Sequence, residues 1–378
     1  MRIPTLKTLL LAACVCVNPA FADEVITIGH ITPLTGPVAY NGKSDTNGAN
    51  LAVQDRNKKG GVLGKQVSII HEDDQCQPAK GINAAEKLIQ KDRVPAIVGG
   101  FCSSVTSAVM PLAEKYKFPL LTGISSAVDL TERGNPWFFR TAETDGLLAE
   151  AFAQVLIDTL KLKTVAYIGL NDDWGRGGVD EFSKEIEALG AKTVLKEYFD
   201  PGATDFYTLL TRVRAAKPDG VFVAAHTQDG SIIVKQMKEL GISSRVFGVG
   251  SWAGADFIKL AGKAGEGIYA AVPYSSSLDT EGNRNFVASY QQAYGNSPDK
   301  YAMAGYNAVN IVMDAIERAG SAEPEKIRDA LKKTDYQAPN GKFMFDDKGQ
   351  AYGFSAVLVQ ITDGKLQVVA DTTIKKHD

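Results

Sequence analysis

The chain has 378 residues, of which 44% are hydrophobic and 22% are charged, and its formal net charge is −3 at pH 7. These values are ordinary for a globular protein, and the lack of a basic excess argues against a nucleic-acid partner. A single hydrophobic core rarely grows beyond about 250–300 residues, so the length predicts two domains.

The N-terminus is typical of a secretory signal peptide. The basic residues Arg2 and Lys7 precede an apolar run over residues 8–17. Ala20-Phe21-Ala22 then has the small-residue pattern of a cleavage site. We therefore expect residues 1–22 to be removed after Ala22 and the protein to be exported. The apolar run is shorter than the roughly 20 residues that a membrane span needs. A lipid anchor at Cys14 is the alternative, but apolar residues continue beyond that cysteine.

Short β-rich runs alternate with helical patterns over most of the chain. Alternation of this kind predicts an α/β fold in which helices cover parallel sheets. The predicted strands are 25–31, 66–71, 96–99, 119–122, 164–170, 193–199, 220–225 and 245–249, and the predicted helices are 45–59, 79–91, 104–117, 177–189, 205–217 and 231–240.

The pattern changes after residue 267, where helices dominate before a strand-rich end. We therefore expect one lobe to combine residues 23–143 with 274–354, and the other to combine 144–273 with 355–378. The predicted elements of this last third are a strand at 268–274, helices at 283–294, 301–318 and 324–333, and strands at 342–345, 354–361 and 366–369.

Removal of the signal peptide would leave two cysteines, Cys76 and Cys102, and each follows a predicted strand. In an exported protein such a pair most simply forms a disulfide. A metal-binding or catalytic pair is the alternative. The chain has no C-x-x-C motif and only four histidines, so we expect neither a metal site nor a redox centre here.

Two serine-containing loops follow neighbouring predicted strands, at residues 99–104 and 122–127. Ligands of open α/β sheets bind beyond the carboxyl ends of the strands. The hydroxyl and N–H groups around Ser103, Ser125 and Ser126 would provide uncharged donors for one carboxylate next to a helix N-terminus. The alternative for each serine is that it only caps a helix.

Other patterns do not support catalysis. Residues 248–253 match G-x-G-x-x-A, but the match lies late in the chain and the bulky Trp252 stands where a dinucleotide-binding helix must pack closely. The acidic run Glu72-Asp73-Asp74 has no spaced metal-ligand partners, so we expect a solvated strand end. No G-x-S-x-G, H-E-x-x-H or Walker motif is present. We therefore expect neither an enzyme nor a cofactor.

Several segments resemble the leucine/isoleucine/valine-binding proteins of bacterial ABC transporters. They are residues 25–29, 33–37, 57–61, 72–78 and 130–134, and their order and spacing continue the likeness from about residue 25 to the C-terminus. The resemblance implies a type I periplasmic binding protein, with two Rossmann-like lobes joined by three hinge segments that close around a ligand. It also implies a periplasmic location and a Cys76–Cys102 disulfide.

The resemblance also implies roles for individual residues. Ser103 matches a carboxylate-binding hydroxyl, and Ser125 and Ser126 match the pair that contacts the carboxylate and ammonium groups. Trp174 takes the place of a stacking tyrosine on the second lobe. Asp145 matches an aspartate near the hinge that meets the amino group in the related glutamate-receptor ligand domains.

The sequence departs from the family pattern at several pocket positions. The glutamate that binds ammonium in the family aligns near Gly250-Ser251, so we expect Asp229 to replace it, with support from Asp145. A tyrosine that contacts ligand aligns with His226 or Thr227. The aromatic side chains expected around the cavity are Tyr40, Phe101, Trp174, Trp252 and Tyr274.

The resemblance implies a monomeric solute-binding component that captures a branched-chain or other hydrophobic amino acid. Its partners would be an inner-membrane permease and a cytoplasmic ATPase. The missing family glutamate leaves a non-amino-acid carboxylate or an amide, such as an aromatic acid, as an alternative ligand. The sequence also leaves open a sensory subunit without a transporter and a secreted enzyme.

Overall fold

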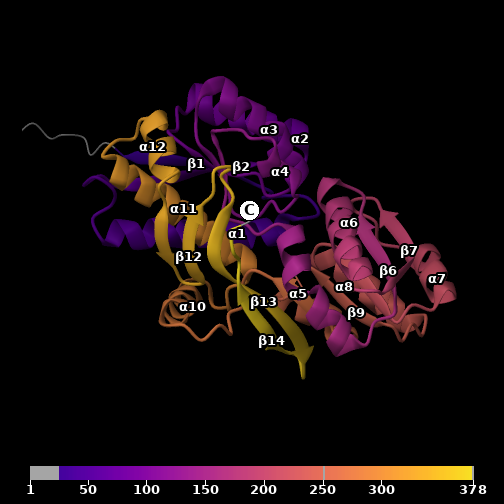
Figure 1. Cartoon of the computed structure of the whole chain (residues 1–378). Helices are drawn as coiled ribbons and strands as arrows, with labels where there is room; N and C mark the ends of the chain where they lie inside the picture. The colour runs from indigo at the N-terminus through magenta and orange to yellow at the C-terminus, as the bar shows by residue number, and fades with distance from the viewer. Residues whose placement is uncertain (1–24, 250–251, 377–378) are drawn as a thin grey trace, which may run out of the picture.

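The computed structural model describes residues 25–249 and 252–376 (Figure 1). The predicted signal peptide, its cleavage after Ala22, Cys14 and the Gly250-Ser251 pair lie outside the described residues. The chain forms two sheets covered by helices, which confirms the α/β fold class and the two-lobed architecture. No helix in the described ranges is long and apolar enough to cross a membrane.

The first sheet is entirely parallel, with strand order β2-β1-β3-β4-β5. The chain alternates between its strands and the helices around it, as the sequence predicts. We call this sheet, its helices and the later helices α10 to α12 lobe 1. The elements are β1 (Ile26–Thr32), α1 (Ala39–Lys58), β2 (Val67–Asp73), α2 (Pro78–Glu86) with η1 (Lys87–Lys91), β3 (Ile97–Gly99), α3 (Ser103–Tyr116), β4 (Leu120–Thr122), α4 (Asp129–Glu132) and β5 (Phe138–Arg140).

The chain then enters a second group of elements, which we call lobe 2 (right in Figure 1). Strands β6 to β10 pair in parallel in the order β10-β9-β8-β6-β7. Every residue of the central strand β8 is buried, as expected for a parallel strand covered on both faces. The elements are α5 (Asp145–Leu160), β6 (Thr164–Leu170), α6 (Asp173–Ala188), β7 (Lys192–Phe199), α7 (Tyr207–Ala216), β8 (Gly220–Ala224), α8 (Thr227–Glu239), β9 (Arg245–Val249), α9 (Ala255–Ala261), η2 (Gly262–Ala264) and β10 (Tyr269–Val272).

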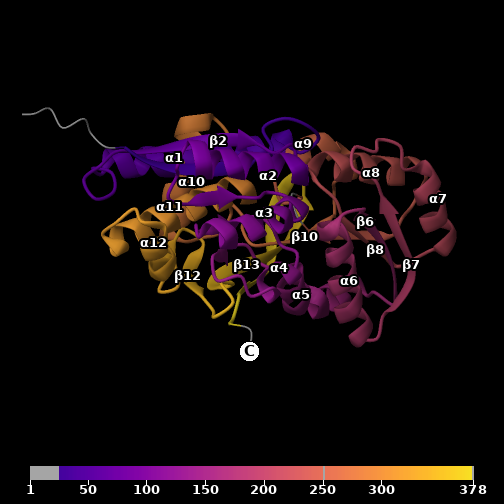
Figure 2. The same ribbon diagram turned by 90° about the horizontal axis from the view of Figure 1, so that it is seen from above.

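After β10 the chain returns to lobe 1, where α11 packs along α1 (Figure 2). Small residues permit this approach, since a Cβ atom at Gly48 would lie 1.9 Å from the carbonyl oxygen of Ala302. Strand β13 pairs antiparallel with both β12 and β10, so it joins the two lobes. The remaining elements are α10 (Glu281–Tyr294), α11 (Lys300–Ala319), α12 (Pro324–Leu331), β11 (Asp335–Ala338), β12 (Gly341–Phe345), β13 (Ala351–Thr362) and β14 (Lys365–Thr373).

Some elements differ from the sequence prediction. Helix α5 was not predicted, because apolar residues occupy several of its faces and hide the 3.6-residue period; Thr144 caps it by accepting a hydrogen bond from the Leu147 N–H at 2.9 Å. Helix α1 begins at Ala39 and not at residue 45. The division into lobes at residues 143/144, 273/274 and 354/355 stays a prediction.

The predicted disulfide between Cys76 and Cys102 is present, with the two Cα atoms 5.5 Å apart. Cys102 immediately precedes α3, so the disulfide ties the start of that helix to the segment after β2. The loop after β3 is thereby fixed to its neighbour.

Candidate functional site

A pocket lies between the two lobes, at the carboxyl ends of lobe 1 strands and beside the N-termini of α6 and α8. Loops after β3 and β4 supply one wall, lobe 2 supplies the facing wall, and the first residues of α11 complete it. The lining residues are Phe101, Cys102, Ser103, Ile124, Ser125, Ser126, Asp172, Trp174, His226, Lys300 and Tyr301. Six of the predicted site residues therefore meet in one pocket.

Ser103 is the first residue of α3, where backbone N–H groups have no intrahelical acceptor. Its hydroxyl oxygen accepts a 3.3 Å hydrogen bond from the N–H of Ala127 on the neighbouring loop. The hydroxyl proton stays available to donate to another group. Together with the helix N-terminus this arrangement suits an anionic oxygen.

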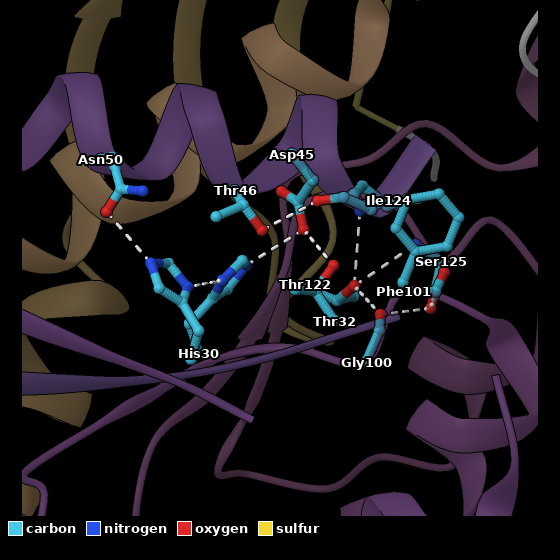
Figure 3. A network of polar contacts seen from close by, with 12 residues as sticks. His30, Thr32, Asp45, Thr46, Asn50, Gly100, Phe101, Thr122, Ile124 and Ser125 are labelled. Carbon is cyan, nitrogen blue, oxygen red and sulfur yellow. Dashed lines mark hydrogen bonds and ion pairs between the residues drawn. The ribbon is translucent and has the colours of Figure 1, made fainter. Parts of the chain in front are cut away.

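Ser125 holds the two loops together (Figure 3). Its hydroxyl donates to the carbonyl oxygen of Gly100 at 2.8 Å and lies 2.6 Å from the hydroxyl of Thr106. Thr122 donates to the same carbonyl at 2.9 Å and accepts from the Ser125 N–H at 3.2 Å. The side chain of Ser125 therefore fixes the two loops relative to each other at the edge of the pocket.

Ser126 connects the pocket to Asp145. Its hydroxyl donates to Asp145 Oδ2 at 2.9 Å, and the Asp145 N–H donates to the Ser126 carbonyl at 3.2 Å. Asp145 is only 2% exposed, and burial raises the pKa of its carboxyl group to about 7. This carboxyl lies behind the lining and supports it.

Aromatic rings form the other side of the pocket. The rings of Trp174 and His226 stack with centroids 4.7 Å apart and an interplanar angle of 18°. Across the cleft Phe101 contacts Tyr301, with centroids 4.9 Å apart, and lies 6.5 Å from the His226 ring. Burial, and secondarily Lys300, lower the pKa of His226 to about 4, so its ring is neutral at pH 7. Both ring nitrogens are buried without a hydrogen-bond partner.

Two charged lining residues were missed by the sequence analysis, Lys300 and Asp172. The Lys300 Nζ lies 3.9 Å from Glu143 Oε1. Burial alone would lower the pKa of this ammonium, but Tyr301 and Glu143 raise it above its ordinary value. Asp172 caps α6 by accepting a 2.8 Å hydrogen bond from the Gly175 N–H, and burial raises its pKa.

The positions of these two residues in the fold explain why only one could have been found. Asp172 follows strand β6, so the rule that selected the serine loops applies equally to it. Lys300 begins α11, and no strand precedes it. Only the return of the chain to lobe 1 brings it to the pocket.

Besides Asp145, two more of the predicted site residues, Asp229 and Tyr274, lie outside this lining. Asp229 is on the first turn of α8, and burial raises its pKa to about 6. Tyr274 lines an adjoining cavity, which shares Lys300 with the pocket, and its hydroxyl donates to Asn283 Oδ1 at 2.8 Å. The adjoining cavity also contains Glu143.

The predicted roles of Tyr40 and Trp252 in an aromatic cavity are wrong. Tyr40 is 47% exposed and borders a separate surface groove with Leu34. Trp252 is fully buried in the core of lobe 2, where it stacks on Phe257 at 4.8 Å and donates from Nε1 to the Ala225 carbonyl at 2.9 Å. It is a packing residue.

The acidic run Glu72-Asp73-Asp74 at the end of β2 is only partly solvated, so that prediction is wrong for Asp74. Asp74 is fully buried and accepts a 2.7 Å hydrogen bond from the Cys76 N–H. Burial raises its pKa to about 6. Asp73 accepts from the Leu34 N–H at 2.9 Å. Among the residues that the structure describes, no group of three or more His, Cys, Asp or Glu side chains could hold a metal ion.

A buried polar cluster lies beneath α1, and none of its side chains lines the pocket (Figure 3). The Nδ1 atoms of His30 and His71 are 2.8 Å apart, and His30 Nε2 is 3.0 Å from Asp45 Oδ2. Thr32 donates to the same carboxylate at 2.8 Å. Burial, followed by the charge of His30, lowers the pKa of His71 to about 4. The cluster ties α1 to β1 and β2.

The two lobes also contact each other through residues that are not part of the chain segments connecting them. The side-chain amide of Asn41, on α1, donates to the hydroxyl of Thr227, on α8, at 2.8 Å, and both residues are buried. The pocket is therefore closed between the lobes in this structure.

This combination of two α/β lobes and an interlobe pocket defines a solute-binding protein. A family described as "Periplasmic binding protein" matches residues 25–365. A Leu/Ile/Val-binding protein of Rhizobium johnstonii is 31% identical over 97% of this chain and 99% of its own length. A leucine-, isoleucine-, valine-, threonine- and alanine-binding protein of Pseudomonas aeruginosa is 29% identical over 89% of each chain. The chain belongs to the leucine/isoleucine/valine-binding protein family.

Solved structures agree in fold. A leucine-binding protein of Thermotoga maritima superposes with a TM-score of 0.85 at 26% identity, covering 92% of this chain and 98% of the other. A solute-binding protein of an ABC transporter from Rhodopseudomonas palustris, in complex with 3,4-dihydroxybenzoic acid, has a TM-score of 0.85 at 27% identity, covering 93% and 98%. Both architectures span nearly the whole of this chain.

Proposed function

We propose that this protein captures a branched-chain or other hydrophobic amino acid in the periplasm and presents it, chemically unchanged, to an ABC permease in the inner membrane. Residues 1–22 would direct export and be cleaved after Ala22, and the mature protein would act as a monomer. A cytoplasmic ATPase would drive uptake. The names of the relatives support this role, since several refer to leucine, isoleucine and valine.

The observation that carries the proposal is the division of the pocket between two kinds of wall. Lobe 1 offers the Ser103 hydroxyl and the start of α3, which suit a carboxylate, and Lys300 adds a positive charge. Lobe 2 offers the stacked rings of Trp174 and His226, which suit an apolar body. A solute that contacts both walls favours the closed state, because only that state brings the walls together.

A carboxylate without an amino group is a second candidate ligand. The four aromatic rings of the pocket, those of Phe101, Trp174, His226 and Tyr301, and the positive charge of Lys300 favour it. The structural relative from Rhodopseudomonas palustris that contains 3,4-dihydroxybenzoic acid supports the same ligand class. The role in transport would be unchanged.

Thermal-shift measurements followed by calorimetry test the ligand class directly. The panel contains the twenty amino acids, benzoate and hydroxybenzoates. We expect leucine, isoleucine or valine to raise the unfolding temperature and to bind with a single site per chain. Stabilisation by the aromatic acids and by none of the amino acids would overturn the preferred ligand and favour the second.

The carboxylate cradle has its own test. Loss of the Ser103 hydroxyl in Ser103→Ala should weaken binding by about 1–3 kcal/mol, because hydrogen bonds to charged groups have this strength. Ser104→Ala is the matched control, since Ser104 is the next residue of α3 and is not part of the lining. Equal affinities of the two variants would reassign Ser103 to loop packing.

A further inference from the structure

The pocket contains a carboxylate whose position in lobe 2 gives it a role that the family resemblance does not assign. An α-amino acid binds as a zwitterion, so its ammonium group needs an acceptor when the lobes exclude water, because an unpaired buried charge is costly. Three aspartates are candidates: Asp145, Asp229 and Asp172. Of these, only Asp172 is in the lining.

Asp145 is already engaged. It is 2% exposed, its Oδ2 accepts the hydroxyl of Ser126, and it lies behind the wall of the pocket. Asp229 is 7% exposed, lies on the first turn of α8 and is not among the residues that line the pocket. Neither carboxyl group is presented to the space that the lobes enclose.

Asp172 lines the pocket, and a hydrogen bond from the backbone fixes its carboxylate there. Its Oδ1 accepts the Gly175 N–H at 2.8 Å, which fixes the side chain at the N-terminus of α6. Asp172 and Trp174, two residues apart in the chain, both line the pocket, so the same segment of lobe 2 supplies a carboxylate and the ring that would cover the apolar part of the solute. Asp172 comes from the lobe opposite the Ser103 cradle.

The charges of the lining balance across the cleft. In the described part of the chain the pocket has one cationic side chain, Lys300 from lobe 1, and one carboxylate, Asp172 from lobe 2. The ring of His226, which also lines the pocket, is neutral at pH 7. A zwitterion with its carboxylate toward Ser103 and Lys300 and its ammonium toward lobe 2 matches this polarity.

We propose that Asp172 accepts the α-ammonium group of the solute, in place of the glutamate that the family provides near residues 250–251. The inference rests on the proposed function, because it requires an amino acid as ligand. It also predicts that the ammonium is bound only when lobe 2 closes over a solute already seated on lobe 1.

Asp172→Asn in the full mature chain tests this role. Asparagine is as good an N-cap as aspartate, so the start of α6 is retained and only the charge is lost. Asp173→Asn is the matched control: the same charge is removed one residue away, from an exposed side chain outside the lining. Unfolding temperatures without ligand establish that both variants are folded.

Each variant is titrated by calorimetry with L-leucine and with 4-methylpentanoate, which has the same carbon skeleton and no ammonium group. Isoleucine, valine and phenylalanine are titrated likewise with their own deaminated acids. We expect Asp172→Asn to weaken amino-acid binding by about 10–100-fold, the range for a charge-assisted hydrogen bond. The deaminated acids should bind Asp172→Asn as well as wild type or more tightly. Asp173→Asn should change neither.

The contrary outcomes separate the two hypotheses. If wild type binds leucine or another of these amino acids and Asp172→Asn binds it equally well, the role of Asp172 is overturned and the proposed function stands. Equal losses for the amino acid and its deaminated acid also overturn it, and a selective loss in Asp229→Asn would assign the ammonium to Asp229. If wild type binds only the deaminated acids or benzoate, the amino-acid ligand and the Asp172 role both fail.

Discussion

The two walls of the pocket differ in how their polar groups are engaged. On lobe 1 the hydroxyls of Ser125 and Ser126 bond to the protein itself, through Gly100 and Asp145. On lobe 2 both ring nitrogens of His226 are buried without a partner. Buried polar groups without partners are costly, and in native proteins each calls for an explanation. The contrast indicates that the lobe 1 hydroxyls are held in place by the protein, whereas the His226 ring of lobe 2 still lacks hydrogen-bond partners that a solute could supply.

This difference suggests an order of events. A solute would first meet the lobe 1 cradle, which the disulfide and the Thr122–Gly100 contacts already hold in place. Closure of lobe 2 would then supply the stacked rings and the charge of Asp172. Substitutions can test this order. In decreasing size of the expected effect, they change Asp145, the disulfide of lobe 1, the Trp174 ring of lobe 2, and the Asn41–Thr227 contact between the lobes.

The largest effect is expected at Asp145, where the walls connect. Its folded-state pKa of about 7 exceeds the ordinary value of 3.8, so the folded protein keeps a proton that the unfolded chain loses. Wild type should therefore lose stability as the pH rises from about 4 to 7, by up to about 4 kcal/mol at 1.36 kcal/mol per pKa unit. Asp145→Asn, which mimics the neutral acid, should remove this dependence in urea unfolding at pH 4.5 and 8.

Asp158→Asn is the control for that experiment. Asp158 is exposed on the same helix, α5, where it accepts a hydrogen bond from Gln154. Its loss should leave the pH dependence of wild type intact. A pH profile for Asp145→Asn that parallels wild type would mean that Asp145 is ionised in the folded state.

The disulfide tests the rigidity of lobe 1. The Cys76→Ser/Cys102→Ser double variant should be about 3–4 kcal/mol less stable, from the chain entropy of a loop with a sequence separation of 26. Because Cys102 lines the pocket next to Ser103, the solute should also bind more weakly. Urea unfolding and calorimetry measure both effects, and reduced wild type serves as the control. Full affinity in the double variant would show that the cradle does not need the disulfide.

These expectations also show what local sequence could predict. The alternation of buried strands and helices predicted the parallel strands of both sheets, since a run such as Gly220–Ala224 is buried on both faces. The sequence did not predict helix α5, because this helix is also apolar around much of its circumference. The two periods that distinguish a strand from a helix are both obscured when an element is buried on several sides.

The site residues, too, divide into those that local sequence predicts and those that only tertiary packing brings to the pocket. Residues directly after parallel strands, such as Ser103 and Trp174, converge on the pocket because the sheet brings strand ends together. Lys300 could not be found in this way, since only the tertiary packing of α11 against α1 brings it there. Tyr40 was misjudged because its place on the exposed side of α1 is not evident from residue type.

Trp174→Ala removes the ring that we expect lobe 2 to place over the solute. Truncation of a buried aromatic anchor typically costs about 2 kcal/mol of binding free energy, or roughly 30-fold in affinity. Trp252→Phe is the control, because that ring lies in the lobe 2 core and its loss should lower the unfolding temperature but not the affinity. Calorimetry with the solute from the ligand panel makes the comparison. Unchanged affinity in Trp174→Ala would remove lobe 2 stacking from the site.

The smallest effect on binding is expected at the hydrogen bond between Asn41 of lobe 1 and Thr227 of lobe 2. Asn41→Ala loses the 2.8 Å hydrogen bond to Thr227, which is worth about 1 kcal/mol. Because this bond exists only when the lobes are closed, its loss should reduce the closed population and weaken solute binding by roughly 5-fold.

A double-mutant cycle with Thr227→Val isolates that contact. The double variant should bind the solute no more weakly than Asn41→Ala, because the bond can be lost only once, and small-angle scattering of the ligand-free protein should show a wider molecule. Additive losses from the two substitutions would mean that each residue acts separately. The Asn41–Thr227 hydrogen bond would then not be the contact that favours the closed state, and closure would depend on other contacts between the two walls.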